Sequence, residues 1–267
     1  MVKRWIVTGD THGDVKTRLK NIFHNNNIET PSELGVIILG DAGLNFYLNK
    51  TDIKKKKELA EFQCYIYCVR GNHEERPQNL GYAIIYDNNV QGYVYLDPIN
   101  ENIRYFKDGE FYNIDNHRIL VIGGAYSVDK WYRLKRAEMT GNSCSGWFAS
   151  EQLIETEKND IAQKIKGEKV DFVFTHTCPI SWEPNDLFLN IIDQSQVDKA
   201  TEIWLEDIKN NIDWNIWCFG HYHADRLERP RVEQFYTNYC WLDEIWNRWN
   251  NNGDITYMTK APLYYAD

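Results

Sequence analysis

Runs of apolar residues that end in metal-binding residue types are the dominant pattern of this chain. Five such runs, with the polar residues that follow them, span 5–12, 36–41, 65–74, 172–176 and 216–223. A continuous apolar run of this length predicts a strand that is buried on both faces. Ligands of open α/β sheets bind beyond the carboxyl ends of the strands. We therefore expect the polar residues after the five runs to converge on one patch.

Local spacing supports this convergence. Asp10 and His12 are two residues apart, as are His221 and His223, and residues at this spacing project to the same side of extended backbone. A glycine, which allows a sharp turn just past a strand, precedes the first polar residue in four of the five runs. These glycines are Gly9, Gly40, Gly71 and Gly220.

The residue types after the runs form a mixed set of carboxylates, imidazoles and one amide. Imidazole suits zinc, iron, copper or nickel, whereas carboxylate oxygen suits manganese or magnesium. The mixed set favours Mn, Fe or Zn, and the sequence does not choose among them. Asp41 is the only carboxylate of its motif, and its two oxygens make it the candidate to bridge two ions. Two adjacent metal ions indicate phosphoryl chemistry.

The series GDTHG, GD, RGNHE, H and GHYH, in this order over residues 5–223, resembles the calcineurin-like metallophosphoesterase superfamily. The resemblance implies an α/β fold with a two-sheet mixed β-sandwich flanked by helices, formed by a single domain over 1–267. It also implies two metal ions and a phosphate-ester substrate. The first ion would be held by Asp10, His12, Asp41 and His223, and the second by Asp41, Asn72, His176 and His221.

The same resemblance assigns roles to two residues of the RGNHE motif. His73 matches the family's catalytic histidine, which is not a metal ligand and protonates the leaving oxygen. Arg70 is a candidate phosphate ligand. We expect a hydroxide that bridges the metals to attack phosphorus directly, without a covalent phosphoenzyme.

The second motif departs from one branch of the superfamily. Serine/threonine protein phosphatases carry GDxxDRG, whereas this chain has Leu44 and Asn45 in place of the Asp that orients the catalytic histidine and the Arg that binds phosphate. A small phosphoester or nucleotide is therefore favoured as substrate over a phosphoprotein, and a catalytically silent metal-binding scaffold is a further alternative. Another group must orient His73, and the open candidates are Glu74, Glu75 and Asp14.

The remaining segments predict the elements around the site. Apolar periodicity predicts helices over 14–25, 51–63, 150–166 and 195–212. Ser150 is the expected N-cap of the third helix, and Ser195 with Asp198 resembles a capping box for the fourth. A sixth strand is expected within 118–125. Shorter alternating segments in 83–115 and 224–257 predict a second, more antiparallel sheet.

Residues 126–148 follow a double glycine and form the candidate specificity loop. The segment combines basic and aromatic residues, which can bind the phosphate and base of a nucleotide. Arg133 and Arg136 are its candidate substrate-binding residues. The alternative is a surface helix that covers the core with its aromatic side chains turned inward.

Composition and charge narrow the classes of partner. Hydrophobic residues make up 43% of the 267 residues, and the formal net charge is −9. The acidic total gives no strong nucleic-acid signal, although the basic stretch 130–136 keeps a nuclease as a weaker alternative. No apolar run approaches the roughly 20 residues of a membrane span, so no membrane partner is expected. Without room for a signal segment before the first run, we expect a cytoplasmic protein with reduced cysteines. The oligomeric state stays open.

Overall fold

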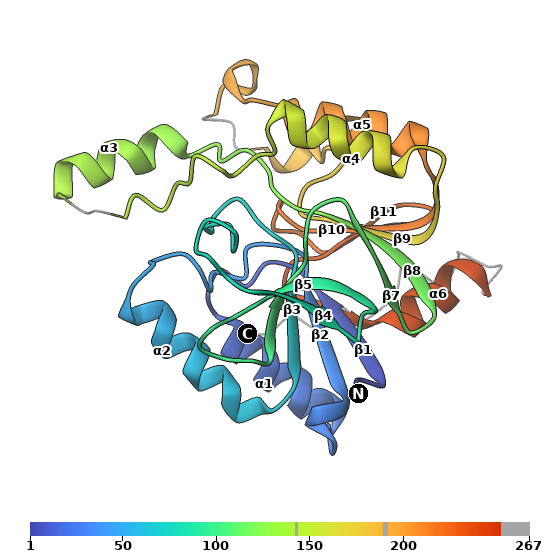
Figure 1. Cartoon of the computed structure of the whole chain (residues 1–267). Helices are drawn as coiled ribbons and strands as arrows, with labels where there is room; N and C mark the ends of the chain where they lie inside the picture. Colours follow the sequence, from blue (N-terminus) through green and yellow to red (C-terminus); the bar gives the residue numbers. More distant parts are fainter. Residues whose placement is uncertain (142–143, 189–191, 252–267) are drawn as a thin grey trace.

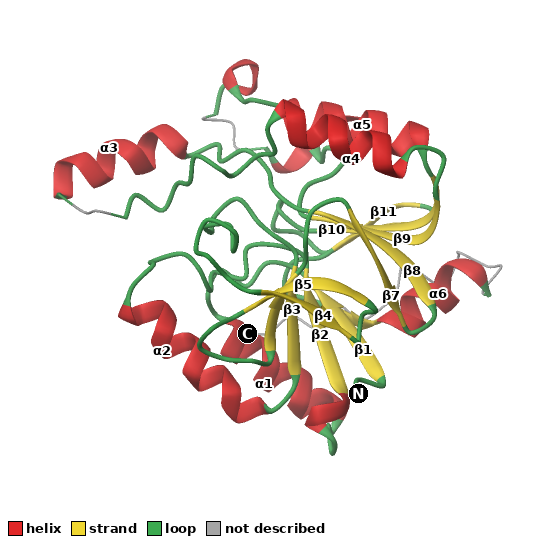
Figure 2. Ribbon diagram, viewed as in Figure 1, coloured by secondary structure: helices red, strands yellow, loops and turns green. Residues whose placement is uncertain are grey.

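The computed structural model describes residues 1–141, 144–188 and 192–251. Two β-sheets pack face to face, and helices cover both outer faces (Figures 1 and 2). This arrangement confirms the predicted two-sheet mixed β-sandwich flanked by helices. Parts of the predicted segments 126–148 and 224–257, namely 142–143 and 252–257, lie outside the described residues.

The first sheet places three of the five ligand-bearing strands side by side. Within it β1, β2, β3 and β6 run parallel, while β13, β5 and β4 pair antiparallel with their neighbours. From one edge to the other, its strands are β13 (Tyr239–Trp241), β1 (Arg4–Thr8), β2 (Leu34–Ile38), β3 (Tyr65–Cys68), β6 (Ile103–Tyr105), β5 (Gly92–Leu96) and β4 (Ile84–Asp87).

The second sheet holds the other two ligand-bearing strands, β9 and β10, at its centre. Here β12, β10, β9 and β8 run parallel, and β11 and β7 are antiparallel edge strands. In order, its strands are β11 (Arg226–Arg229), β12 (Val232–Gln234), β10 (Asp213–Phe219), β9 (Lys169–Thr175), β8 (His117–Ile122) and β7 (Glu110–Ile114).

The predicted grouping of the shorter strands is wrong. The segments 83–115 and 224–257 do not form a separate antiparallel sheet, because their strands divide between the two sheets and extend both. Alternation in a sequence identifies a half-buried strand but does not reveal its partner.

The helices bury the outer faces of the two sheets. α1 (Val15–Asn26) and α2 (Lys50–Leu59) cover the first sheet, and α4 (Glu155–Ile165) and α5 (Ala200–Asn211) cover the second (Figure 2). α6 (Leu242–Asn250) follows β13 and contacts β1. Short 3₁₀ helices lie at Pro31–Glu33, Ala60–Phe62, Ile180–Trp182, Asn185–Leu187 and Gln194–Gln196.

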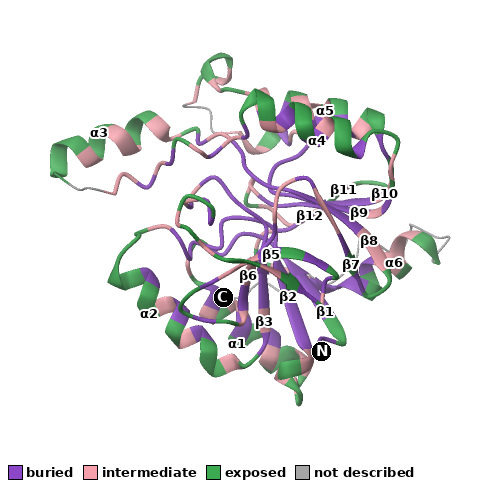
Figure 3. Cartoon of the chain, in the orientation of Figure 1, coloured by how far each residue is buried: buried purple, intermediate pink, exposed green. Residues whose placement is uncertain are grey.

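Strand periodicity explains the three hydrophobic layers. On β1, Trp5 and Val7 join the core between the sheets, whereas Ile6 packs in the layer under α1 with Leu19. The buried interior follows both sheets in Figure 3. Burial of one such side chain stabilises the fold by about 1.5–3 kcal/mol. The sheets are therefore held rigidly where their carboxyl ends meet.

Two predicted helix starts are wrong. α4 begins at Glu155 rather than after Ser150, because the Ser150 hydroxyl donates to Glu75 and its carbonyl oxygen accepts from the Arg76 guanidinium. α5 begins at Ala200, and residues 194–196 before it form a 3₁₀ turn instead of the start of the helix. The two serine hydroxyls therefore bind elsewhere, whereas Asp198 accepts from the Ala200 N–H at the start of α5.

Residues 126–148 contain α3 (Lys130–Thr140), which projects away from both sheets (Figure 1). None of its described residues is buried, and Trp131 and Tyr132 are 70% and 66% exposed. The expectation that aromatic side chains of this segment turn inward is therefore wrong for Trp131 and Tyr132, whereas Phe148 after the helix is 7% exposed. The helix extends past the edge of the sandwich, so it has no sheet face to cover.

Candidate metal centre and active-site cavity

The predicted ligands follow five parallel strands whose carboxyl ends meet at one edge of the sandwich. The first sheet supplies four of them after β1, β2 and β3, and the second sheet supplies three after β9 and β10. The four from the first sheet are Asp10, His12, Asp41 and Asn72, and the three from the second are His176, His221 and His223.

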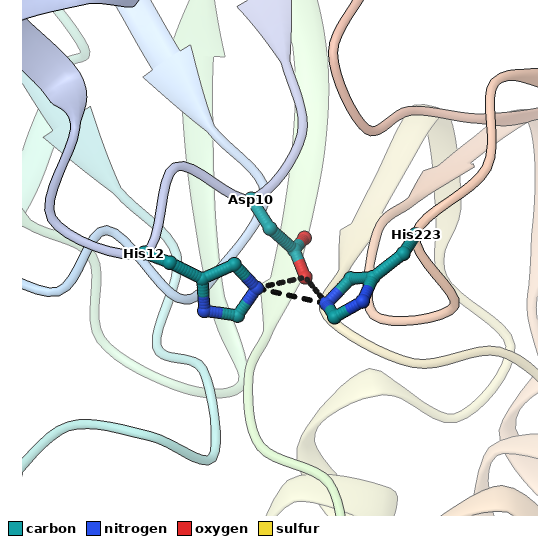
Figure 4. Close-up of side chains that lie close together, drawn as sticks. All are labelled: Asp10, His12 and His223. Atoms are coloured by element: carbon teal, nitrogen blue, oxygen red, sulfur yellow. Dashed lines mark hydrogen bonds and ion pairs between the residues drawn. The ribbon is translucent and has the colours of Figure 1, made fainter.

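Asp10, His12 and His223 form one compact group (Figure 4). The Nε2 atoms of His12 and His223 are 2.8 Å apart, and Asp10 Oδ2 lies 3.8 Å and 3.5 Å from them. Asp10 is 1% exposed, and its Oδ2 has no hydrogen-bond partner among the described residues. Buried polar atoms are rarely left unpaired, so this oxygen fits a ligand of a cation.

Asp41 joins this group to a second one. Its Oδ2 lies 3.8 Å from His12 Nδ1 and 3.7 Å from His176 Nε2, so one oxygen faces a histidine of each predicted metal site. This is the placement expected of a bridging carboxylate. Asp10 also reaches His176, with its Oδ1 4.0 Å from Nδ1, and these two carboxylates with His176 form a fully buried group.

The hydrogen bonds of His176 leave its other ring nitrogen facing an acceptor. Nδ1 donates to the Leu39 carbonyl oxygen at 2.9 Å, so Nε2 presents a lone pair. Nε2 nevertheless lies 2.8 Å from Asn72 Oδ1, while the Asn72 amide nitrogen donates to Ser127 Oγ. Two acceptors that face each other favour a shared cation. Metal-bound histidines also donate their other N–H to such a carbonyl.

His221 lies beside the cluster but outside both compact groups. Its backbone N–H donates to Asp10 Oδ1 at 3.1 Å, and its ring centroid is 5.0 Å from that of His176. Burial lowers the pKa of His221 well below its usual range, which keeps the imidazole neutral. A neutral imidazole is the form that binds metal.

Neighbouring charges shift the pKa values of Asp41 and His223 in opposite directions. Burial works to raise the pKa of Asp41, but His176, His73 and His12 lower it, and the net pKa lies below the ordinary value. Asp41 is therefore ionised at neutral pH. The pKa of His223 moves in the opposite direction, because the nearby Asp10 carboxylate raises it despite partial burial.

Backbone conformation is unusual at these ligands. Four of the seven have a left-handed φ, although none is glycine, and such residues cost roughly 1–3 kcal/mol each. They are His12 at 45°, Asp41 at 47°, His221 at 69° and His223 at 53°. Backbone strain of this kind clusters at functional sites, where the surrounding structure holds it in place.

The glycines before the ligands act mainly through the absence of Cβ. A Cβ on Gly71 would overlap Asp41 Oδ1, and one on Gly220 would overlap Asp10 Oδ1. Of the four glycines, only Gly40 has the left-handed φ that the sharp-turn explanation requires, at +97°. The sequence-based explanation is therefore corrected at the other three, where the glycine permits close packing.

Comparison with known proteins agrees with this geometry. The family model for the calcineurin-like phosphoesterases matches residues 3–225, most of the chain. The protein belongs to the calcineurin-like phosphoesterase family. Membership shows metal-dependent phosphoester hydrolysis as its general class of chemistry.

Comparisons with curated sequences and with solved structures add less. A search of curated protein sequences finds no match. Among solved structures, the chain is similar to a phosphopantetheinyl hydrolase from Mycobacterium tuberculosis, with 12% identity, 92% coverage of each chain and a TM-score of 0.38.

In the described part of this phosphoesterase, no helix combines the length and apolar character needed to cross a membrane.

A cavity of about 330 Å³ opens beside the metal ligands of this phosphoesterase. On one side it is lined by His12, Asp41 and His221, together with His73. The lining also includes residues of 126–129, 183–188 and 192–202. The predicted catalytic histidine therefore shares one space with the candidate metal centre.

His73 contacts two of the predicted metal ligands, Asp41 and Asn72. Its backbone N–H donates to Asp41 Oδ1 at 2.9 Å, and its Nε2 lies 3.2 Å from the Asn72 amide nitrogen, a donor. The ring proton is then on Nδ1, which is buried without a partner among the described residues. Burial lowers the pKa of His73, and Asp41 opposes this shift.

None of the three open candidates for orienting His73 makes a described hydrogen bond to its ring. Their carboxylates have other partners: Glu74 accepts from the Gly71 N–H, Glu75 from Ser150, and Asp14 from the Thr17 N–H of α1.

Asp129 is the neighbour that sequence reasoning missed. It lines the cavity, and its charge raises the pKa of His73. One oxygen accepts from Arg133 Nε at 2.7 Å, whereas Oδ1 is buried without a partner in the described chain. Asp129 also occupies the N-cap position of α3 without capping it. No motif marks this residue, because it meets His73 only through the fold.

The three predicted substrate-binding arginines occupy different places. Arg70 is 5% exposed and donates to Asp108 and to the carbonyl oxygens of Gly123 and Glu151, away from the lining of the metal-site cavity. Arg133 lines that cavity in its ion pair with Asp129. Arg136 is exposed on α3 and is not part of the lining.

Proposed function

We propose that this protein is a dinuclear metal-dependent phosphoesterase that acts on a small phosphoester or nucleotide. The observation that carries the proposal is the close approach of metal-binding side-chain atoms at the strand ends. His176 Nε2 faces Asn72 Oδ1, and His12 Nε2 faces His223 Nε2, in both cases at 2.8 Å. Both pairs adjoin buried carboxylates and the cavity that contains His73.

The predicted ligands divide between two cations as the resemblance implies. When bound, the ions would supply an activated water and neutralise phosphoryl oxygens. Mn, Fe and Zn all suit the mixed nitrogen and oxygen donors. One ion would be held by Asp10, His12, Asp41 and His223, and the other by Asp41, Asn72, His176 and His221.

The remaining chemistry belongs to protein side chains around the phosphate. His73 would deliver a proton to the leaving oxygen, and a positioned proton donor contributes about 10²–10⁴-fold. The proton would leave from Nε2 of the doubly protonated ring, with the Asn72 amide then donating to Ser127 Oγ alone. Asp129 lines the same cavity, and one of its carboxylate oxygens has no partner among the described residues. We assign Asp129 as the residue that orients His73 through Nδ1.

The second motif supports a small substrate over a phosphoprotein. Leu44 is fully buried, and Asn45 is 1% exposed and accepts hydrogen bonds from Lys56 and Tyr82. The positions that serve serine/threonine phosphatases therefore belong to the interior here. Of the three predicted substrate-binding arginines, Arg133 is the one that lines the cavity, where it could contact a substrate oxygen.

Activity assays after reconstitution with Mn, Fe or Zn test the proposal. We expect p-nitrophenyl phosphate, its bis ester or a nucleotide to be hydrolysed, with phosphopeptides much slower. Rapid turnover of phosphopeptides alone would favour the protein phosphatase. Bound metal without turnover of any phosphoester would favour a silent scaffold, and failure to bind any of the three metals would refute the site.

A further inference from the structure

One part of the cavity lining, here called the wall, combines apolar side chains with one buried acid. Val128, Leu187, Phe188 and Val197 line this part of the cavity. Lys199 and Glu202 lie among them, Lys199 just before α5 and Glu202 in its first turn. Small-molecule sites have this composition, with mostly apolar lining and a few placed polar groups.

Glu202 is buried and only half satisfied. It is 3% exposed, and one carboxyl oxygen accepts from Thr177 Oγ1 at 2.8 Å. The other oxygen, Oε2, has no hydrogen-bond partner among the described residues, although the residue lines the cavity. Leaving a buried polar atom unpaired is costly, so its presence in a cavity wall calls for a partner.

The neighbouring side chains do not provide that partner. Lys199 Nζ forms its ion pair with Glu183 at 2.7 Å and lies 4.5 Å from the centroid of the Phe188 ring. The Tyr222 hydroxyl pairs with Thr177 at 3.0 Å. Burial raises the pKa of Glu202 to about 7, which agrees with the lack of a direct ion pair.

Glu202 is also linked to the metal ligands through its hydrogen-bond partner. Thr177, which donates to Glu202, follows His176 directly, and Tyr222 stands between His221 and His223. Glu202 therefore lines the same cavity as the predicted metal ligands His12, Asp41 and His221.

We propose that this wall binds the leaving group of the substrate, and that Glu202 Oε2 accepts a hydrogen bond from it. The leaving group is then a flat or apolar body that carries an N–H or O–H donor, as an amino-bearing base does. This inference rests on the proposed phosphoesterase function and specifies its substrate class.

Matched substrates separate the hydrogen bond from the size of the leaving group. We would compare phenyl phosphate with 2-, 3- and 4-aminophenyl phosphate, using the metal-loaded full-length enzyme. The wild type should prefer at least one amino compound by about tenfold in kcat/KM, the effect of one good hydrogen bond. In Glu202→Leu this preference, the ratio of the two kcat/KM values, should fall to near one.

Control variants keep the result decisive. Glu206→Leu, one turn further along α5 and outside the cavity lining, should retain the full preference. If Glu202→Leu does not fold, Glu202→Gln replaces it and should show a reduced preference. An unchanged preference in the folded variants, or no preference in the wild type, overturns the inference. Failure to hydrolyse these monoesters together with p-nitrophenyl phosphate, its bis ester and nucleotides would instead refute the proposed phosphoesterase function.

Discussion

Single atoms decide whether the metal ligands can approach each other. A Cβ on Gly71 would overlap both Asp41 Oδ1 and the Asp41 backbone nitrogen. Gly71→Ala should therefore displace Asp41, destabilise the fold by roughly 1–3 kcal/mol and abolish stoichiometric metal binding. Thermal unfolding and elemental analysis measure these two effects.

A second glycine provides the matched control for this substitution. Gly81 has a left-handed φ of +70°, but a Cβ there meets no atom within 4 Å. Gly81→Ala should cost stability, roughly 1–2 kcal/mol, and leave the metal content unchanged. Equal metal loss in both variants would show that general destabilisation, rather than overlap with Asp41, explains the Gly71 result.

Substitution of His73 tests its assignment as a proton donor. His73→Asn should lower kcat by about 10²–10⁴-fold, because the leaving oxygen would depart without a proton. The metal content should stay at the wild-type value, since His73 contacts Asp41 only through its backbone N–H. Loss of metal in parallel with activity would make His73 a ligand and contradict the assignment.

Asp129 should act through His73 and not through substrate binding. We expect Asp129→Asn to lower kcat roughly ten- to a hundredfold, the range for partners that orient a ligand, with KM nearly unchanged. Asp129→Glu should restore part of kcat. A change confined to KM would instead assign Asp129 to substrate binding through its ion pair with Arg133.

At the level of elements, the sequence predicts strands better than it predicts helix starts. Each ligand-bearing strand is an apolar run with a polar end, so burial and position can both be read from it. The helix starts near Ser150 and Ser195 were mispredicted because those hydroxyls bind Glu75 and Asp193. A capping pattern cannot reveal a competing tertiary partner.

In the candidate site too, some features could be predicted from the sequence and others could not. The positions of His176 and of the other predicted ligands follow from strand ends, so motif and periodicity suffice. The left-handed φ of the ligands, the burial of Arg70 and the approach of Asp129 to His73 depend on packing between distant segments. Residue order alone contains no local signal for them.

α3 is the least supported element of the described chain. Its 11 residues include none that is buried, and helices shorter than about 12–15 residues are marginal in water without tertiary packing. Limited trypsin digestion should therefore cut first after Lys135 or Arg136. α5, of similar length but with a buried face, should resist. Protection of α3 in solution would show that another surface covers it.

At the scale of the whole molecule, metal binding should stabilise the sandwich. A ligand that binds only the folded state stabilises by about 2.7 kcal/mol at 100 times its dissociation constant. For a chain of this size, this raises the melting temperature by roughly 5–10 °C. Addition of Mn to metal-free protein and reversal by a chelator measure the shift. No shift with Mn, Fe or Zn would argue against the centre.

The division of ligands between the sheets has one more consequence. Neither sheet alone carries a complete set for either ion, since β1 to β3 lack His176 and His223, and β9 and β10 lack every carboxylate ligand. The binding sites form only when the two sheets pack together through the layer that includes Val7 and Phe174. Cavities introduced in that layer should weaken metal affinity without changing a ligand, so ion uptake becomes a readout of how well the two sheets fit together.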